Sequence, residues 1–366
     1  MLRWLALFLA LVWPGLSGAG TVRIAFFTAE LDRAGPGLLL RDLQGGTDAQ
    51  IDAVVQVVAA ASPDVLLLAR VDYDLDGAAL AALAERIGAA GSAYPFRLAL
   101  RPNSGDATDL DLDGDGRFRG AGDAQGWGEF AGQNGMAVLS KLPIETSAVR
   151  DFTTLLWRDL PGATLPRYPD GSPFPSDAAQ AILRLASTGF WDIPVILPDD
   201  RRLHVLAFHA TPPVFDGEED RNGLRNRDEL RFWPLLLDGA LPWPAPRAPF
   251  VLIGNTNVDP DRGEGFREAA AALVGHGTHG DPAPESAGGT AAGHPRATAI
   301  WTGDGQPGAL RLDYVLPSVD LEIANSGVVW PAPGMPDAAA VDAASHHRLV
   351  WVDIELPDTS IARSLP

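Results

Sequence analysis

The chain has 366 residues, of which 46% are hydrophobic, and it contains no cysteine. It has enough apolar material for one large domain or two small ones, whereas disulfides, thiolate metal sites and cysteine catalysis are excluded. The formal net charge of −19 argues against a general affinity for nucleic acid, because neutralisation of phosphates supplies most of that affinity.

The amino terminus has the features of a secretory signal. A positive start at Arg3 precedes an apolar run from Trp4 to Trp13, and the small residues Ser17 and Ala19 flank the expected cleavage site. The run is too short to span a bilayer comfortably. We therefore expect residues 1–19 to be a cleaved signal peptide and the mature protein to be secreted or periplasmic, without a transmembrane segment. An uncleaved amino-terminal anchor is the alternative.

Apolar runs alternate with stretches of helical spacing along most of the chain. This pattern predicts a layered α/β domain, in which polar residues at the strand exits share one rim. The segment 150–180 reads as irregular, and 358–366 as a frayed tail. The predicted strands are 21–27, 65–69, 135–140, 193–196, 202–209, 250–253, 310–317 and 348–355, and the predicted helices are 47–61, 77–91, 178–185 and part of 218–238.

An acidic insertion, 101–134, interrupts this alternation. Within it, residues 109–116 read D-L-D-L-D-G-D-G, the front half of a calcium loop, with ligand positions at Asp111, Asp113 and Asp115. The twelfth position is a glycine rather than the bidentate glutamate of a complete EF-hand. The alternative is an acidic surface loop, but so many carboxylates repel one another without a cation, so we favour a calcium-ordered loop.

A second cluster of metal-binding side chains lies in a Gly/Ala/Pro-rich segment, 275–295. It holds His276, His279 and His294, a set that could bind zinc. A solvated loop is the more common meaning of such a composition, and we expect one here.

Polar side chains follow the predicted strands where they end. The apolar run 250–253 leads into Gly254, Asn255 and Asn257, and the other strand ends or strands carry Thr28, Glu30, Arg70, Asp72, His209, Asp313, His346 and His347. A rim of Asp, Asn, Glu and His suits hydrolysis of a phosphate ester. Carboxylates hold magnesium, and a histidine held by an aspartate transfers the proton.

Seven short motifs in a fixed order give the chain a family resemblance. They are V-R-I-A-F-F-T (22–28), D-V-L-L-L-A-R-V-D (64–72), N-G-M-A-V-L-S (134–140), L-A-F-H-A-T-P-P (206–213), V-L-I-G-N-T-N (251–257), R-L-D-Y-V-L (311–316) and S-H-H-R-L-V (345–350). Together they resemble the endonuclease/exonuclease/phosphatase superfamily of deoxyribonuclease-like and sphingomyelinase-like phosphodiesterases. The resemblance implies one domain, 21–357, built as a four-layered α/β sandwich of two mixed sheets packed face to face with helices outside.

The resemblance also assigns roles to individual residues. His347 falls on the catalytic histidine, Asp313 on the aspartate that orients it, His209 on a second histidine and Asn257 on an asparagine that contacts phosphate or metal. Four positions depart from the family pattern. Thr28 replaces an asparagine, Arg70 the metal-binding glutamate, Asn255 the aspartate of G-D-x-N, and His346 the aspartate of S-D-H.

These replacements argue against the magnesium ion that the resemblance implies, because a permanently charged arginine stands where a carboxylate is needed. We expect first that Arg70 forms an ion pair with Asp72 or Glu30. The second alternative is that Arg70 binds phosphate, together with Asn255 and Asn257. The third is that Glu30 and Asp72 supply displaced carboxylates for magnesium.

The sequence thus predicts an exported, monomeric relative of metal-dependent phosphodiester and phosphomonoester hydrolases with weak or lost activity. The alternative is a non-catalytic extracellular protein that binds a phosphate-bearing or other anionic ligand at the same site. The sequence leaves the ester open among small molecules, lipids and nucleic acids.

Overall fold

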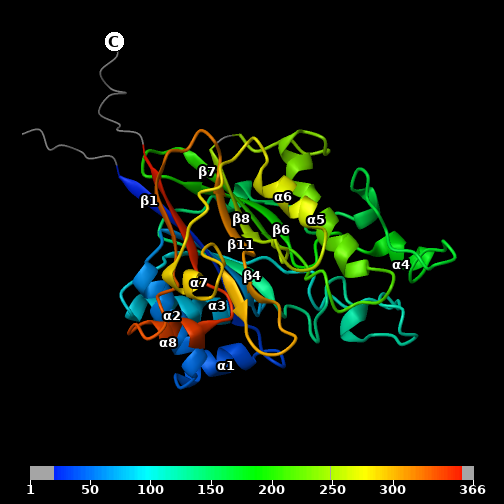
Figure 1. Cartoon of the computed structure of the whole chain (residues 1–366), viewed down its shortest axis with the longest axis horizontal. Helices are drawn as coiled ribbons and strands as arrows, with labels where there is room; N and C mark the ends of the chain where they lie inside the picture. The colour runs from blue at the N-terminus through cyan, green and yellow to red at the C-terminus, as the bar shows by residue number, and fades with distance from the viewer. Residues whose placement is uncertain (1–19, 248, 357–366) are drawn as a thin grey trace, which may run out of the picture.

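In the computed structural model, which describes residues 20–247 and 249–356, two mixed β-sheets pack face to face with helices on their outer sides (Figure 1). The expected signal peptide, 1–19, and tail, 358–366, lie outside the described residues. Within these two ranges, no helix is both long and apolar enough to cross a membrane.

The first sheet has six strands, of which β1 and β2 run parallel and the other neighbours antiparallel. Its order is β12 (Ile323–Val328), β13 (Val350–Glu355), β1 (Thr21–Leu31), β2 (Val65–Val71), β4 (Gly135–Ser140) and β3 (Phe96–Leu98).

The second sheet has five strands, of which β7 and β8 run parallel. Its order is β11 (Asp313–Pro317), β8 (Phe250–Asn255), β7 (Arg202–His209), β6 (Phe190–Ile196) and β5 (Arg150–Asp151), and β9 (Ala299–Trp301) forms a separate hairpin with β10 (Gly308–Leu310).

Side chains on both faces of the sheets are buried, which explains the continuous apolar runs in the sequence. On β1, Ile24 and Phe26 face the second sheet and belong to the same core between the sheets as Val205 of β7. The intervening Ala25 and Phe27 face outward into a second core beneath the helices. Alternation along one strand thus fills two layers of the protein.

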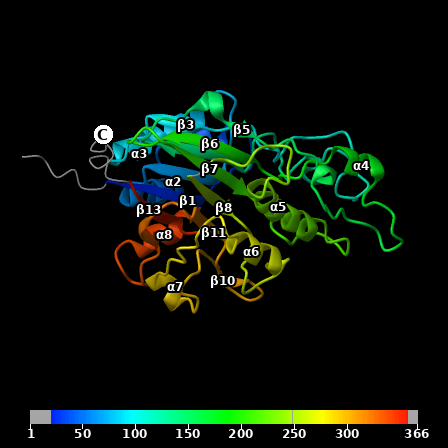
Figure 2. The same cartoon turned by 90° about the horizontal axis from the view of Figure 1, so that it is seen from above.

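Helices complete the outer layers on both sides (Figures 1 and 2). The first sheet is covered by α1 (Leu38–Gly45), α2 (Ala49–Ala61), α3 (Ala78–Ala89) and α8 (Ala338–Ala344). The second is covered by α5 (Arg221–Leu237) and α6 (Arg267–Val274), and the short helices are α4 (Asp177–Ile182) and α7 (Ala287–Ala291). This arrangement confirms the predicted four-layered α/β sandwich.

Some elements differ from the sequence prediction. The predicted strand 310–317 is two strands, because Arg311 and Leu312 carry the chain from β10, which pairs with β9, to β11, which pairs with β8. α1 was not predicted; it begins after Gly37, which has a φ of 76° and no side-chain cap. The strands β3, β5, β9 and β12 were also missed, since most are too short to show a pattern.

The register of the second sheet brings three predicted site residues into one row. His209 at the end of β7 pairs with Asn255 at the end of β8. Asn255 in turn pairs with Asp313 at the start of the antiparallel β11. The carboxyl ends of the parallel strands therefore meet the amino end of their antiparallel neighbour at one edge of the sheet.

Candidate active site

The centre of the candidate site is a buried histidine–aspartate pair. Nδ1 of His347 lies 2.8 Å from Oδ2 of Asp313, and the two residues are 3% and 1% exposed. Asp313 also accepts hydrogen bonds from Thr28 Oγ1 (2.9 Å), Asn255 Nδ2 (2.8 Å) and Thr298 Oγ1 (2.9 Å). Since a carboxylate offers about four acceptor positions, the Asp313 carboxylate is saturated. It therefore fixes the proton of His347 on Nδ1 and leaves Nε2 as the basic nitrogen.

The turn that carries His347 is clamped by the next residue. Nη1 of Arg348 donates to the carbonyls of Ser345 (2.6 Å) and His347 (3.1 Å), and its backbone N–H donates to Thr298 (2.6 Å). The ring of Trp301 on β9 meets His347 edge to face, with the centroids 5.2 Å apart. Hydrogen bonds and packing together hold the imidazole in one orientation.

Asn255 supports this pair rather than facing a ligand. It is fully buried, it donates to Asp313, and its Oδ1 accepts the backbone N–H of Asn257 at 2.6 Å. The expectation that Asn255 contacts phosphate is therefore corrected, because both ends of its carboxamide are occupied inside the protein. Asn257, with a φ of 52°, donates one of its two amide hydrogens to Ala210 O at 2.6 Å and is only partly buried.

His209 is buried beside this cluster. Burial, followed by the charges of Arg70 and His347, lowers its pKa to about 3. Burial is the largest cause of this shift in pKa, and the charge of Arg70 acts in the same direction. His209 thus stays neutral at physiological pH, where it can form hydrogen bonds but carries no charge.

A second cluster is organised around Glu30. Its Oε1 accepts from Arg70 Nη1 at 2.7 Å, and its Oε2 accepts from the backbone N–H and Nδ1 of His346, both at 2.9 Å, and from Ser345 Oγ at 3.0 Å. Burial alone would raise the pKa of Glu30, but Arg70 and the donors from His346 lower it to about 2. Glu30 is therefore a carboxylate whose two oxygens are both engaged.

The ion pair expected for Arg70 is formed with Glu30 but not with Asp72. The second partner of its guanidinium is Asp32, at 2.8 Å from Nη2. Glu30 and Arg70 both have left-handed backbones, with φ of 52° and 54°, and the pairing register of β1 and β2 shifts between these positions. Side chains two residues apart therefore do not share a face here, which is why the expected placement of Asp72 beside Arg70 was wrong.

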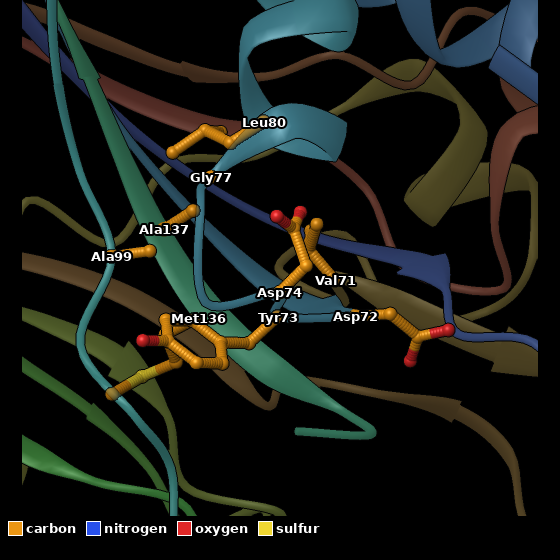
Figure 3. A pocket seen from close by; sticks show the side chains of 9 residues that line it. All are labelled: Val71, Asp72, Tyr73, Asp74, Gly77, Leu80, Ala99, Met136 and Ala137. Atoms are coloured by element: carbon orange, nitrogen blue, oxygen red, sulfur yellow. The ribbon is translucent and has the colours of Figure 1, made fainter. Parts of the chain in front are cut away.

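Asp72 instead holds two loops. Its carboxylate accepts the backbone N–H groups of Arg33 (2.9 Å) and Asn134 (3.3 Å), and burial raises its pKa to about 6. Figure 3 shows its side chain pointing away from a small cavity lined by Leu80 and Ala137. That cavity measures about 10 Å³, room for one water molecule at most, so it is no substrate site.

These contacts test the third alternative, a displaced magnesium site at Glu30 and Asp72, and the residues do not fit one. Arg70 neutralises Glu30, whose oxygens all have protein donors, and Asp72 is committed to backbone N–H groups. Magnesium needs free carboxylate oxygens. In the part of the chain that the structure describes, only the loop carboxylates of Asp111, Asp113 and Asp115 bring three ligand atoms within 4.8 Å of one another.

The acidic loop turns at two glycines that are held by Asp111. Asp111 accepts the N–H groups of Gly114 (2.6 Å) and Gly116 (2.9 Å), whose φ values of 78° and 77° favour glycine. Asp113 accepts from Asp115 N at 3.2 Å, and burial raises the pKa of Asp113. One carboxylate oxygen from each of Asp111, Asp113 and Asp115 lies within 4.8 Å of the other two.

The three loop histidines are not a solvated set. His279 and His294 are 5% and 8% exposed, and each has a protein partner. His279 Nε2 lies 2.8 Å from Leu273 O, and His294 Nε2 lies 3.1 Å from Asp259 Oδ2. The expected solvated loop was wrong for these two, because they stabilise the segment by packing inward. The zinc alternative has no support either, since no group of three ligand atoms in the described ranges includes them.

Sequence reasoning missed several residues of the site. Thr298 and Ser345 were not singled out, although each connects two strand ends through its hydroxyl. Asp32 and Trp301 were missed as well. Isolated Ser, Thr and Trp residues carry no pattern. Position was the useful signal: Thr298 directly precedes the short strand β9, Trp301 ends it, and Ser345 begins the motif that contains His347.

Comparisons with known proteins agree with the fold. The model of the Endonuclease/Exonuclease/phosphatase family matches residues 42–352. A family protein from Beutenbergia cavernae has a similar structure, with a TM-score of 0.51 at 18% identity over 92% of this chain and 72% of that chain. Family proteins from Leptotrichia buccalis (14% identity, 92% and 100% coverage) and Bacteroides thetaiotaomicron (12%, 93% and 99%) each have a TM-score of 0.50. A comparison with curated protein sequences found no match.

Proposed function

Because the chain belongs to the endonuclease/exonuclease/phosphatase family, whose fold indicates a phosphoesterase or nuclease-like hydrolase, we propose that it binds a phosphate ester and hydrolyses it slowly without magnesium. One observation supports this proposal above others. The histidine–aspartate pair, His347 with Asp313, is complete, while Glu30 is neutralised by Arg70.

The proposed reaction uses the groups that surround this pair. Nε2 of His347 accepts a proton from the water that attacks phosphorus, and the imidazolium is stabilised by Asp313. The remaining N–H groups of Arg70 and the side chain of Asn257 contact the phosphoryl oxygens. The bond from phosphorus to the leaving oxygen then breaks, and the proton on Nε2 of His347 passes to the leaving oxygen or to solvent water. Without a Lewis acid, which supplies several kcal/mol in related chemistry, a low rate follows.

The test is hydrolysis of bis-p-nitrophenyl phosphate by the wild-type protein. We expect slow turnover at the same rate in the presence of EDTA and in the presence of excess magnesium, because Arg70 already pairs with the carboxylates of Glu30 and Asp32. The same substrate in phosphate-free buffer without the protein gives the background rate. Turnover that disappears with EDTA and returns with magnesium would contradict the proposal.

The second candidate is a non-catalytic protein that binds an anionic ligand. It is favoured by the loss of negative charge at three family positions, now Arg70, Asn255 and His346. The same assay separates the two. A silent wild type, together with magnesium-dependent turnover in the combined variant Arg70→Glu, Asn255→Asp and His346→Asp, would establish the binding protein.

We also propose that the protein is exported as a monomer to the periplasm or the extracellular space. The apolar run after Arg3 and the small residues up to Ala19 support export. The ester itself, whether a small molecule, a lipid or a nucleic acid, stays open at this level.

For the acidic loop, we propose calcium as the bound ion, because hard carboxylate oxygens at alternate positions suit it. The melting temperature is expected to rise when calcium is added to the wild type. The rise should be absent in the double variant Asp111→Ala/Asp113→Ala and present in a control that removes the exposed Asp304 (Asp304→Ala). A wild type that does not respond to calcium would contradict this assignment.

A further inference from the structure

The proposed reaction needs a proton for the leaving oxygen as well as a base for the attacking water. These two oxygens lie roughly in line on opposite sides of phosphorus, so a base beside the water is not placed to protonate the leaving oxygen. His209 is no source of this proton, because burial and the charges of Arg70 and His347 lower its pKa to about 3. The acid must therefore come from another side chain of the site.

His346 is held by a carboxylate in the same way as its neighbour His347. Its Nδ1 lies 2.9 Å from Oε2 of Glu30, as Nδ1 of His347 lies 2.8 Å from Oδ2 of Asp313. Because Glu30 has a pKa of about 2 and is ionised, it accepts this hydrogen bond, and Nδ1 of His346 carries the hydrogen. Nε2 points away from Glu30. The side chain is 57% exposed, so this nitrogen can exchange protons with solvent.

Glu30 also places His346 beside the group that is proposed to contact the phosphoryl oxygens. Its other oxygen, Oε1, accepts from Nη1 of Arg70 at 2.7 Å. One carboxylate thus holds both the guanidinium and the imidazole. It also lies near the proposed base, because the charge of His347 contributes to the lowered pKa of Glu30. The base, the guanidinium and His346 therefore surround a single buried carboxylate.

Trp301 orients both imidazole rings. The ring of His346 stacks on its indole, with centroids 5.9 Å apart and an angle of 11° between the planes. The ring of His347 meets the same indole at 87°, with centroids 5.2 Å apart. The two neighbouring imidazoles are thus steeply inclined to each other. Different orientations suit a base and an acid that act on opposite oxygens of one phosphoryl group.

We propose that His346 is a further catalytic residue, the acid that protonates the leaving oxygen. Nε2–H of the His346 imidazolium donates its proton as the bond from phosphorus to the leaving oxygen breaks, and the neutral ring takes up a new proton from solvent. The proton that His347 removes from the attacking water then returns to solvent. The inference rests on the proposed function, to which it adds a class of substrate, esters whose leaving oxygen is too basic to depart unprotonated.

Two phosphodiesters with different leaving groups, bis-p-nitrophenyl phosphate and diphenyl phosphate, test the inference. Phenolate binds a proton up to about pH 10, as the side chain of tyrosine does, whereas p-nitrophenolate is a much weaker base and leaves without one. We expect the rate ratio, nitrophenyl over phenyl ester, to rise by about 10²-fold in His346→Ala, because the phenyl ester depends on the acid. The same rise is expected in His346→Gln, whose amide transfers no proton. Initial rates of p-nitrophenolate and phenol release are measured in the presence of EDTA.

Two further variants serve as controls. His347→Ala should lower both rates and leave their ratio as in the wild type, because the base acts on water in both reactions. His276→Ala removes a histidine that pairs with the exposed carboxylate of Asp238 outside the site, and it should change neither rate. A general folding defect lowers both rates together and does not change the ratio.

The outcomes separate this inference from the function on which it rests. An unchanged ratio in both His346 variants overturns the inference while slow hydrolysis stands. A wild type that cleaves bis-p-nitrophenyl phosphate but not diphenyl phosphate overturns it as well, since such a site has no working acid. If the wild type cleaves neither ester, the proposed function fails and the inference with it.

Discussion

Turnover of bis-p-nitrophenyl phosphate is expected to fall by about 10²- to 10⁴-fold when His347 is replaced by alanine, the usual contribution of a positioned proton acceptor. Asp313→Asn should cause a loss of similar direction, since an amide nitrogen facing Nδ1 would favour the wrong tautomer of His347. The measurement is the initial rate of p-nitrophenolate release in the presence of EDTA.

A matched control exists in the second sheet, the one that carries Asp313. His204 on β7 also pairs through Nδ1 with a buried aspartate, Asp192, at 2.8 Å. His204→Ala removes a histidine–carboxylate pair that is not part of the candidate site. The Asp192 carboxylate keeps a charge partner in this variant, because Arg150 lies 2.6 Å from it. Equal rates for His347→Ala and wild type would remove His347 from the mechanism, whereas a loss in both histidine variants would indicate a general defect of the fold.

The second large effect is expected on stability. Arg225 in α5 is 6% exposed, and its guanidinium donates to the backbone carbonyls of four residues, Gln125, Arg184, Leu185 and Ala186. Arg225→Met is expected to lower the free energy of unfolding by about 3–5 kcal/mol, because it leaves buried carbonyls without donors and Glu229 without its charge partner. Urea unfolding followed by circular dichroism measures the change.

Arg41→Met is the corresponding control. Arg41 also lies within a helix, α1, but its side chain is 67% exposed and pairs only with the neighbouring Asp42. We expect a change of about 0.5 kcal/mol or less, as for exposed ion pairs in general. A loss for Arg225→Met no greater than that for Arg41→Met would show that the buried guanidinium does not hold these loops together.

Much of the fold followed from apolar runs and helical spacing. The core strands β2, β4, β7 and β8 were found with errors of at most a few residues, because each is buried on both faces and ends at, or directly before, a polar residue. The pairing of His347 with Asp313 was also expected, because the order of the motifs resembles that of a known family. The family resemblance implies that these two residues meet, which their spacing in the sequence does not.

The rest depended on local backbone geometry that residue types do not reveal. The left-handed conformations of Glu30 and Arg70 reversed the expected facing of their neighbours, so Arg70 pairs with Asp32, besides Glu30, and not with Asp72. Likewise, composition suggested a solvated loop around His279 and His294, but long-range partners hold both inside. Contacts between distant segments decided these cases.

The saturation of Asp313 limits how charge can travel through the protein. With donors from Thr28, Asn255, Thr298 and His347 filling its oxygens, the aspartate has no capacity to relay a proton inward. A proton taken up at Nε2 of His347 is therefore released again from Nε2. In deuterated solvent, we expect proton uptake and proton release at this nitrogen both to be slower.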